Sequence, residues 1–281
     1  MLEYVPMSQN PGDLYAIYVE GETKTGKGAA STAVANALKD QGFSVYYDVA
    51  GDFFRRYVAI LRLELGLGDD GILPHRDELE VIATKLYENG KAFSIDRDLG
   101  DLQRPAISHC VSLLGELPIA QKAASDWYGQ SVRQAAASGA QILVLDGRNP
   151  RRHVEDHVSV LDVNVKTILD IYMTCEPEVA ARRVLLSDGI DEPSVDQLKL
   201  IVANIAHRRA LDRTRAEWPF WWPETHLAFI PGKQPPTGAI ESSWLCEAPP
   251  LPIVIDNSHV PKPVMWQAVA DLAIGALQYS R

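Results

Sequence analysis

The sequence is poor in cysteine and long apolar runs, and it carries no excess of positive charge. Its three cysteines, Cys110, Cys175 and Cys246, are odd in number and far apart. They predict reduced thiols in a cytoplasmic protein, with neither a disulfide framework nor a zinc pattern. No apolar run approaches the ~18 residues of a membrane span. Residues 1–11 lack the basic start and apolar core of a signal peptide. We therefore expect no membrane association.

The charge balance limits the partners. There are 27 lysines and arginines against 37 aspartates and glutamates, a net charge of −10. This disfavours a surface that coats nucleic acid, which would need a basic face. A local basic cleft for phosphates stays open, and it would show as clustered arginines. With 281 residues the chain can bury a full core, and we expect one α/β domain over residues 1–281.

The order of apolar segments predicts the fold class. A strand at 14–20, a loop at 21–28, a helix at 29–41 and a strand at 43–48 form a βαβ unit with a parallel sheet. Strands and helices alternate beyond it, which predicts a doubly wound α/β fold. The further strands are expected at 141–146, 167–174 and 251–256, and the further helices at 51–65, 79–89, 120–138, from 177 through 183, 195–215 and 263–279.

Residues 218–252 interrupt this alternation. They contain 8 of the 18 prolines and 4 of the 6 tryptophans, so a regular helix through most of the segment is excluded. So many aromatic side chains are costly to leave in water, which favours an ordered insertion or flap over a free linker.

Residues 21–28 read Gly-Glu-Thr-Lys-Thr-Gly-Lys-Gly, the G-x-x-x-x-G-K pattern of a phosphate-binding loop. Its glycines let backbone N–H groups turn toward a phosphate, and the following helix presents its positive dipole end. Lys27 can reach the β- and γ-phosphates. Gly28 stands where many such loops carry the Ser or Thr that binds Mg²⁺. The alternative is a glycine-rich turn with an incidental lysine. The residues predicted to bind the nucleotide here are Gly21, Thr23, Lys24, Thr25, Gly26, Lys27, Gly28 and Ala29.

Three arginine clusters accompany the loop, at residues 55–56, 182–183 and 207–215. Phosphoryl transfer needs two phosphates held in line and neutralised, and the planar guanidinium grips phosphate oxygens bidentately. In the third cluster the spacing i, i+4, i+7 places Arg208, Asp212 and Arg215 on one helical face. The alternative for each cluster is a solvated helix face. We interpret residues 153–157 (HVEDH) as a polar surface turn, because the zinc-binding H-E-x-x-H order is missing.

Taken in order, several segments resemble the bacterial and archaeal cytidylate kinases. The matching segments are the GKG ending of the loop, Ala50–Arg55, Leu145–Arg148, Glu178 with Arg182-Arg183, the set Arg208, Asp212, Arg215 and Pro219, and Ile253–Ser258. The resemblance covers most of residues 14–281 apart from the insertion. It implies a P-loop kinase fold with an arginine-rich helical lid at residues 182–215.

The resemblance also implies roles for individual residues. Lys27 and the loop amides would hold ATP, with Asp256 near the adenine. Asp146 would hold Mg²⁺ or its waters; otherwise it is a structural carboxylate. On the acceptor side, Asp52, Arg55, Arg148, Arg208 and Asp212 would bind the acceptor's phosphate and sugar, and Arg182, Arg183 and Arg215 would close over the transition state.

The positions that read the base depart from the family. Ser112 matches, but Gln121 and Asn149 stand where the family has Arg and Asp. An amide both donates and accepts, so it can read another base face. The sequence thus predicts an ATP-dependent pyrimidine nucleotide kinase with altered base recognition. A kinase of a modified pyrimidine in DNA is an alternative, against which the acidic charge counts. Another is a P-loop NTP-binding module without acceptor, which would not need the arginine clusters.

Overall fold

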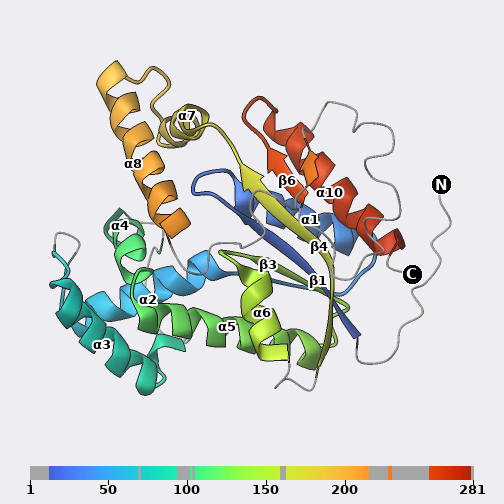
Figure 1. Ribbon diagram of the computed structural model, residues 1–281, viewed down its shortest axis with the longest axis horizontal. Helices are drawn as coiled ribbons and strands as arrows, with labels where there is room; N and C mark the ends of the chain where they lie inside the picture. Colours follow the sequence, from blue (N-terminus) through green and yellow to red (C-terminus); the bar gives the residue numbers. More distant parts are fainter. Residues whose placement is uncertain are drawn as a thin grey trace. The chain divides into compact units, whose positions relative to one another are not determined.

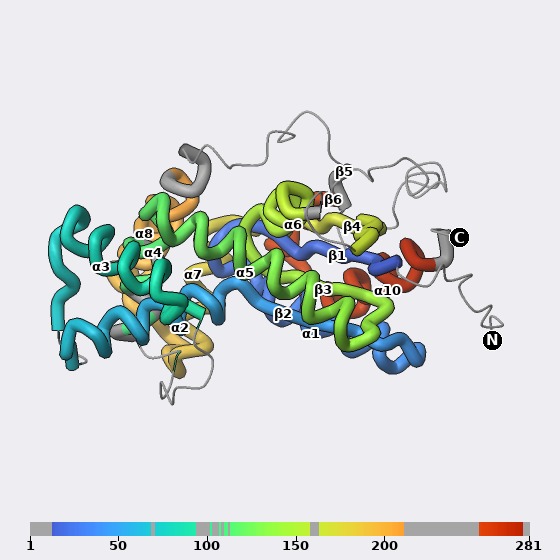
Figure 2. Tube along the Cα trace, turned by 90° about the horizontal axis from the view of Figure 1, so that it is seen from below, coloured from blue at the N-terminus to red at the C-terminus, as the bar shows by residue number. Residues whose placement is uncertain are grey.

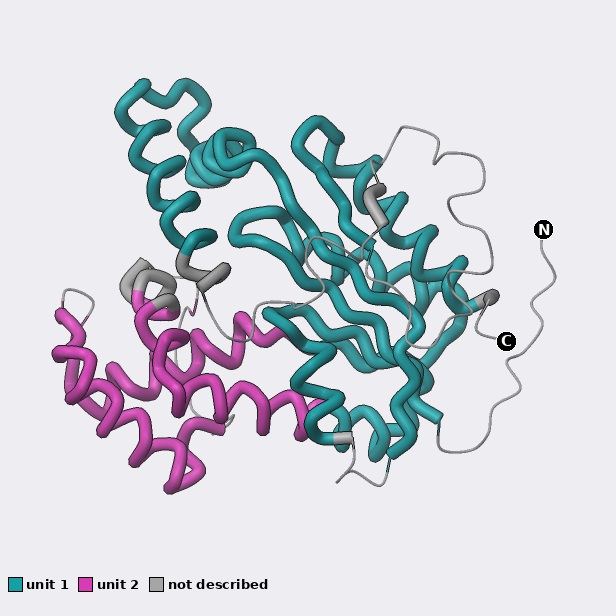
Figure 3. The backbone as a smooth tube through the Cα atoms, in the orientation of Figure 1, with its two compact units in different colours: residues 1–48, 132–281 teal, residues 49–131 magenta. Residues whose placement is uncertain are grey.

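The computed structural model describes residues 13–68, 71–93, 102, 105–158, 163–214, 227–229 and 253–279. The chain divides into two compact units (Figure 3). The first comprises residues 1–48 and 132–281, and the second comprises residues 49–131. Over the described ranges, no helix is long and apolar enough to cross a membrane.

A six-stranded sheet forms the centre of the first unit, in the order β2-β3-β1-β4-β6-β5 (Figure 1). β1 pairs in parallel with β3 and β4, and β6 pairs in parallel with β4 and β5. The prediction of an α/β fold with a parallel sheet is confirmed. The strands are β1 (Asp13–Gly21), β2 (Val45–Val49), β3 (Ile142–Asp146), β4 (Asn164–Thr174), β5 (Leu227–Phe229) and β6 (Ile253–Asp256).

Helices cover both faces of this sheet (Figure 2). α1 (Lys27–Asp40) and α10 (Lys262–Tyr279) pack side by side on one face, over a core that includes Ile17 and Val19 of β1. α6 (Pro150–Val158) lies on the other face against β1 and β4. Successive residues of a strand point to opposite faces, so β1 is apolar on both sides until its last residues.

The strand order makes the end of β1 the favoured place for a ligand. From β1 the chain passes to β2 on one side, returns to β3, and then crosses to β4 on the other side. Ligands of open α/β sheets bind outside the carboxyl ends of the strands at such a switch point. At this edge the structure gathers the strand ends Gly21, Asp146, Thr174 and Asp256.

Two further helices of the first unit are α7 (Pro177–Ser187) and α8 (Val195–Thr214). They pack against each other around Ala180, Ala181 and Ile205. Pro177 stands in the first turn of α7, where its missing N–H has no intrahelical partner to lose. Of the arginines of the predicted lid at residues 182–215, Arg182 and Arg183 lie on α7 and Arg215 is outside the described residues.

The second unit is helical, with α2 (Ala50–Glu64), α3 (Arg76–Glu88), the 3₁₀ helix η1 (Lys91–Phe93), α4 (Pro105–Leu114) and most of α5 (Pro118–Ala137). Aromatic rings build its centre. Phe53 stacks on Phe93 and Trp127 at centroid distances of 5.9 and 5.8 Å. The Tyr57 hydroxyl, buried between helices, donates to the carbonyl of Ala83 at 2.7 Å.

Several parts of the fold differ from the sequence prediction. α4, η1 and β5 were not predicted. The polar turn predicted at residues 153–157 was wrong, because the segment belongs to α6. His153 and Val154 point inward while Arg152 and Glu155 point outward, so its amphipathicity has a helical period. Burial lowers the pKa of His153 to about 4, so this ring is neutral. Of the predicted insertion, only β5 lies within the described residues.

Candidate functional site

The loop between β1 and α1 starts with a glycine that no other residue can replace. Gly21 has φ +144°, and a Cβ at this position would lie 2.1 Å from the carbonyl oxygen of Met173 on β4. The next residue donates its backbone N–H to the same oxygen at 3.0 Å. The first residues of the loop are therefore in close contact with β4 where the loop leaves the sheet.

The rest of the loop turns tightly into α1. Lys24 and Gly26 have positive φ values of 63° and 88°. The Thr25 hydroxyl and the Lys27 ammonium both donate to the carbonyl of Glu22, at 2.8 and 2.9 Å. α1 begins at Lys27 with no acidic residue in its first turn. The positive end of its dipole is therefore not neutralised from within the helix, which suits a bound anion.

A carboxylate stands beside the start of α1. Asp146, at the end of β3, is 5% exposed, and the Ser31 hydroxyl donates to its Oδ2 at 3.0 Å. A Cβ on Gly28 would lie 3.6 Å from the same oxygen. The Tyr47 hydroxyl is 2.9 Å from that of Ser31. Position 28 thus has no hydroxyl, but Ser31, one turn later, contacts the Asp146 carboxylate.

These groups fit a magnesium ion that is held mainly by phosphate oxygens. Mg²⁺ commonly takes one or two protein carboxylates together with substrate phosphates and water. Asp146 supplies one carboxylate next to the loop. Within the described ranges, no group of three or more His, Cys, Asp or Glu side chains could hold a metal without such help.

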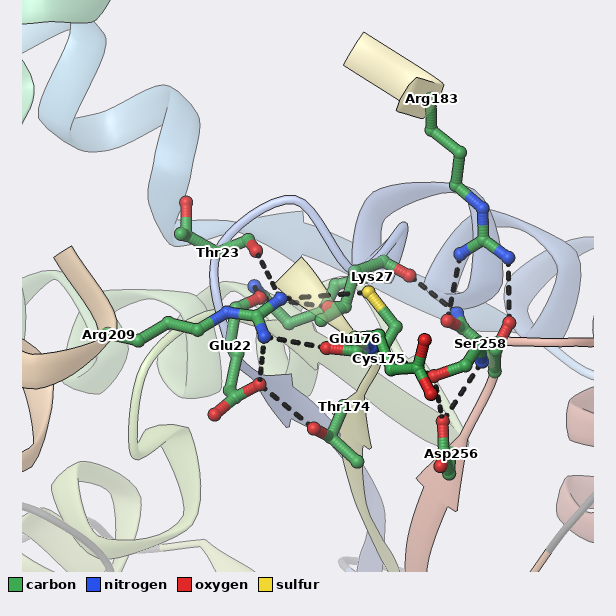
Figure 4. A network of polar contacts seen from close by, with 12 residues as sticks. Glu22, Thr23, Lys27, Thr174, Cys175, Glu176, Arg183, Arg209, Asp256 and Ser258 are labelled. Atoms are coloured by element: carbon green, nitrogen blue, oxygen red, sulfur yellow. Dashed lines mark hydrogen bonds and ion pairs between the residues drawn. The ribbon is translucent and has the colours of Figure 1, made fainter. Parts of the chain in front are cut away.

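A buried ion pair joins the loop to α8 (Figure 4). Arg209 Nη1 lies 2.9 Å from Glu22 Oε2, with these side chains 7% and 3% exposed. The same Nη1 donates to the carbonyl of Cys175 at 2.6 Å, and the Thr174 hydroxyl donates to Glu22 Oε2 at 2.9 Å. A buried charge is tolerated only when it is paired and hydrogen-bonded, as both are here. α8, the loop and the end of β4 are thereby fixed together.

A second bridge comes from the residue after β6. Asn257 donates from Nδ2 to the carbonyl of Thr25 at 2.6 Å. Its Oδ1 and its backbone oxygen accept from the two Nη atoms of Arg183, at 2.8 and 2.7 Å. The neighbouring Asp256 holds the backbone N–H and hydroxyl of Ser258, and that hydroxyl accepts from the N–H of Glu176 (Figure 4).

Two buried carboxylates lie near the end of β1. Glu20 is 5% exposed, and its pKa is raised to about 8, first by burial and then by repulsion from Asp170. A backbone hydrogen bond from Asn149 and the charges of Lys27 and Arg148 act in the opposite direction. Burial also raises the pKa of Asp170 to about 6, although Arg151 Nη1 lies 3.3 Å from its Oδ2. Glu20 therefore contacts the turn that carries Arg148 and Asn149.

The carboxyl group of Glu20 should make the protein less stable as the pH rises. Between the ordinary pKa of 4.5 and about 8, folded Glu20 holds a proton that the unfolded chain has released. The free energy of unfolding then falls with increasing pH. Glu20→Gln should flatten this decline, measured by urea denaturation from pH 6 to 9. Glu178→Gln, an exposed change of the same type on α7, should leave the decline as it is. Parallel curves for wild type and Glu20→Gln would show that Glu20 ionises normally.

The predicted donor-side residues and several predicted acceptor residues belong to the first unit. Lys27 and the loop, Asp146 and Asp256 lie at one sheet edge, and Arg148 and Asn149 follow β3, the latter with φ 51°. Arg182 is exposed on α7, whereas Arg208 is half-buried on α8. The side chain of Asp212 and all of Arg215 lie outside the described residues.

The other predicted acceptor residues belong to the second unit. Asp52 and Arg55, one turn apart on α2, form an ion pair of 2.8 Å. Gln121 on α5 donates from Nε2 to the carbonyl of Gly115. Ser112 lies on α4, and its side chain is outside the described part of the chain.

Five residues in or beside the loop were not predicted as part of the site: Glu20, Glu22, Ser31, Arg209 and Asn257. One signal was present, for Glu20 and Glu22. Acidic residues flank the first glycine of the loop at the end of an apolar strand, where a charge requires a partner. Arg209 gave no such signal. The i, i+4, i+7 pattern of α8 selects Arg208, Asp212 and Arg215, and Arg209 lies next to that face.

Comparison with known proteins adds little. No family model matches the chain, and no curated protein sequence matches it. Among solved structures, the chain is similar to one described as "a putative kinase" from Chloroflexus aurantiacus, with 11% sequence identity over 96% of this chain and 99% of that one. The TM-score is 0.38. Likeness at this level supports no conclusion about chemistry.

Proposed function

We propose that this protein is an ATP-dependent phosphotransferase of the nucleotide-kinase type. The observation that carries the proposal is the β1–α1 loop. The loop contributes its glycines, the positive end of α1 and Lys27. It lies at the switch point of a parallel sheet, where the carboxylate of Asp146 is next to Gly28. Such a loop can cradle a polyphosphate with backbone N–H groups and a lysine ammonium.

On the donor side, the loop residues Gly21–Ala29 would bind the phosphates of ATP, and Asp256 would lie near its adenine. Lys27 would leave the carbonyl of Glu22 and reach the β- and γ-phosphates. Asp146 fits Mg²⁺ or its waters, and the ion would supply charge neutralisation between the phosphates. Ser31 would hold the Asp146 carboxylate in place.

On the acceptor side, we propose that Asp52, Arg55, Arg148, Arg208 and Asp212 bind the phosphate and sugar of a nucleoside monophosphate. Arg182, Arg183 and Arg215 would belong to a lid over residues 182–215 of a single kinase domain, into which residues 218–252 are inserted. Ser112, Gln121 and Asn149 would read a pyrimidine base in a way that differs from cytidylate kinases.

ADP release from MgATP against a panel of acceptors tests this function. We expect release that depends on one of CMP, dCMP, UMP or dTMP, because an acceptor phosphate would engage the arginines. Release stimulated only by DNA with modified pyrimidines would establish the alternative acceptor. ADP release that is independent of every acceptor would identify an NTP-hydrolysing module and overturn the kinase proposal.

A further inference from the structure

We propose that Asn257 and Arg209 are positioning residues, which orient the N–H groups of the phosphate loop by holding its carbonyls from outside. The inference rests on the proposed function, since it concerns how the loop recognises a polyphosphate. Neither residue belongs to the loop, and neither needs to touch the nucleotide.

The planarity of the peptide bond links each loop carbonyl to the N–H group that follows it. In a trans peptide the C=O of one residue and the N–H of the next point in opposite directions. Three peptide groups of the loop have their carbonyls fixed. Glu22 O accepts from Lys27 and Thr25, Thr23 O accepts from Arg209 Nη2 at 3.4 Å, and Thr25 O accepts from Asn257. The N–H groups of Thr23, Lys24 and Gly26 are thereby directed away from these anchors.

The two anchors from outside the loop, Arg209 and Asn257, differ from the inner anchor, in which loop side chains hold the carbonyl of Glu22. If Lys27 turns to a phosphate, Glu22 O keeps the Thr25 hydroxyl as a donor. Thr23 O and Thr25 O rely on partners from α8 and from the end of β6. Those partners are themselves fixed, Arg209 by its ion pair with Glu22 and Asn257 by Arg183.

The orientation of the Asn257 amide follows from its partners. A carbonyl can only accept and a guanidinium can only donate. Between Thr25 O and Arg183, the side chain must therefore present Nδ2 to the loop and Oδ1 to the arginine. Asn257 is 1% exposed, so water does not readily replace it. An aspartate of the same shape would keep the bond to Arg183 but face the Thr25 carbonyl with a lone pair.

The consequence for binding is preorganisation. Hydrogen bonds from N–H groups to an ionised phosphate are strong when they are aligned in advance, and rotating a peptide plane at the moment of binding costs affinity. A loop without its outer anchors should fold but bind polyphosphate more weakly. For Asn257 the loss should appear on the donor side, because its side chain is hydrogen-bonded to the loop and to Arg183 and to none of the proposed acceptor residues.

The test uses Asn257→Asp in the full-length protein. Its Kd for the non-hydrolysable analogue AMP-PNP with Mg²⁺, measured by calorimetry, should rise about 10- to 100-fold, which corresponds to one charge-assisted hydrogen bond lost. Asn257→Ala, which removes the donor without adding charge, should show a smaller rise of the same sign. Asn204→Asp makes the same chemical change at an exposed site on α8 and should leave the Kd unchanged.

Steady-state kinetics separate positioning from a purely structural role. Asn257→Ala should raise KM for ATP while KM for the acceptor stays within about twofold. A wild-type Kd for AMP-PNP in folded Asn257→Ala, or equal rises in both KM values, would overturn the inference. If Asn257→Asp does not fold, as judged by circular dichroism, Asn257→Ala and Arg209→Lys decide the question. Failure of the wild-type protein to bind AMP-PNP is a different result, which would refute the proposed function itself.

Discussion

Replacing Lys27 with methionine is expected to lower kcat by about 10²- to 10³-fold with MgATP and the preferred acceptor, the usual loss when one preorganised donor to a developing charge is removed. Lys27 would supply an ammonium at the start of α1, where charge on the transferred phosphoryl group has to be neutralised. Methionine keeps the unbranched stem and removes only the charge and its hydrogen bonds.

The structure adds a second expectation for this variant. Lys27 Nζ shares the Glu22 carbonyl with the Thr25 hydroxyl, so the loop retains one internal bond when the lysine is lost. The free energy of unfolding should therefore change by no more than about 1 kcal/mol, the net value of one hydrogen bond. Unfolding and turnover are measured on the same preparation.

Lys39→Met is the matched control, because Lys39 is exposed in the last turn of the same helix. It should leave kcat unchanged. Retention of more than a tenth of wild-type kcat by Lys27→Met would mean that the lysine takes no part in phosphoryl transfer, and the glycine-rich turn would then be structural only.

The first unit was predictable from the sequence because its signals are local. A strand, a glycine loop and a helix within about 30 residues determine a βαβ unit. The strand ends at Asp146 and Asp256 fell where short apolar runs meet polar residues. Each helix predicted up to 215 was found with bounds shifted by one to three residues at most positions, because caps and turns move an end but not the apolar stripe.

The network around the loop was not predictable for the opposite reason. Glu22 and Arg209 are 187 residues apart, and Thr25 and Asn257 are 232 apart. No periodicity in either segment encodes the partner, since a buried charge selects any group of opposite sign that the fold brings near. Ser31 is a similar case. It follows Gly28 by one helical turn, and nothing in the local sequence indicates that the fold brings its hydroxyl to Asp146.

Asp146, Ser31, Asn257 and Arg209 act on the loop from four different elements, β3, α1, the end of β6 and α8. A loop that is held by its own short sequence could be transplanted into another strand–helix unit with its affinity intact. This loop depends on residues that are distant in the chain, so its phosphate affinity should be coupled to the integrity of α7 and α8. That coupling would give Arg183 of α7 and Arg209 of α8 a role on the donor side, in addition to any role over the acceptor.

Arg209→Met should be the most destabilising single substitution in this network. It removes a guanidinium that is 7% exposed and leaves the Glu22 carboxylate buried without its ion pair. Breaking a buried pair in this way costs about 3–5 kcal/mol. Urea denaturation of the full chain, followed by circular dichroism, measures the loss. Arg133→Met, at an exposed site on α5, should change the free energy of unfolding by no more than about 0.5 kcal/mol.

The double variant Glu22→Met/Arg209→Met distinguishes pairing from packing. Replacing both partners of a buried ion pair with apolar side chains is often close to neutral, because neither charge then needs solvation. The double variant should thus be more stable than Arg209→Met alone, and the two single effects should be strongly non-additive. Simple addition of the single losses would mean that each side chain stabilises the protein through separate contacts, with Arg209 acting through the carbonyls of Cys175 and Thr23 and not through Glu22.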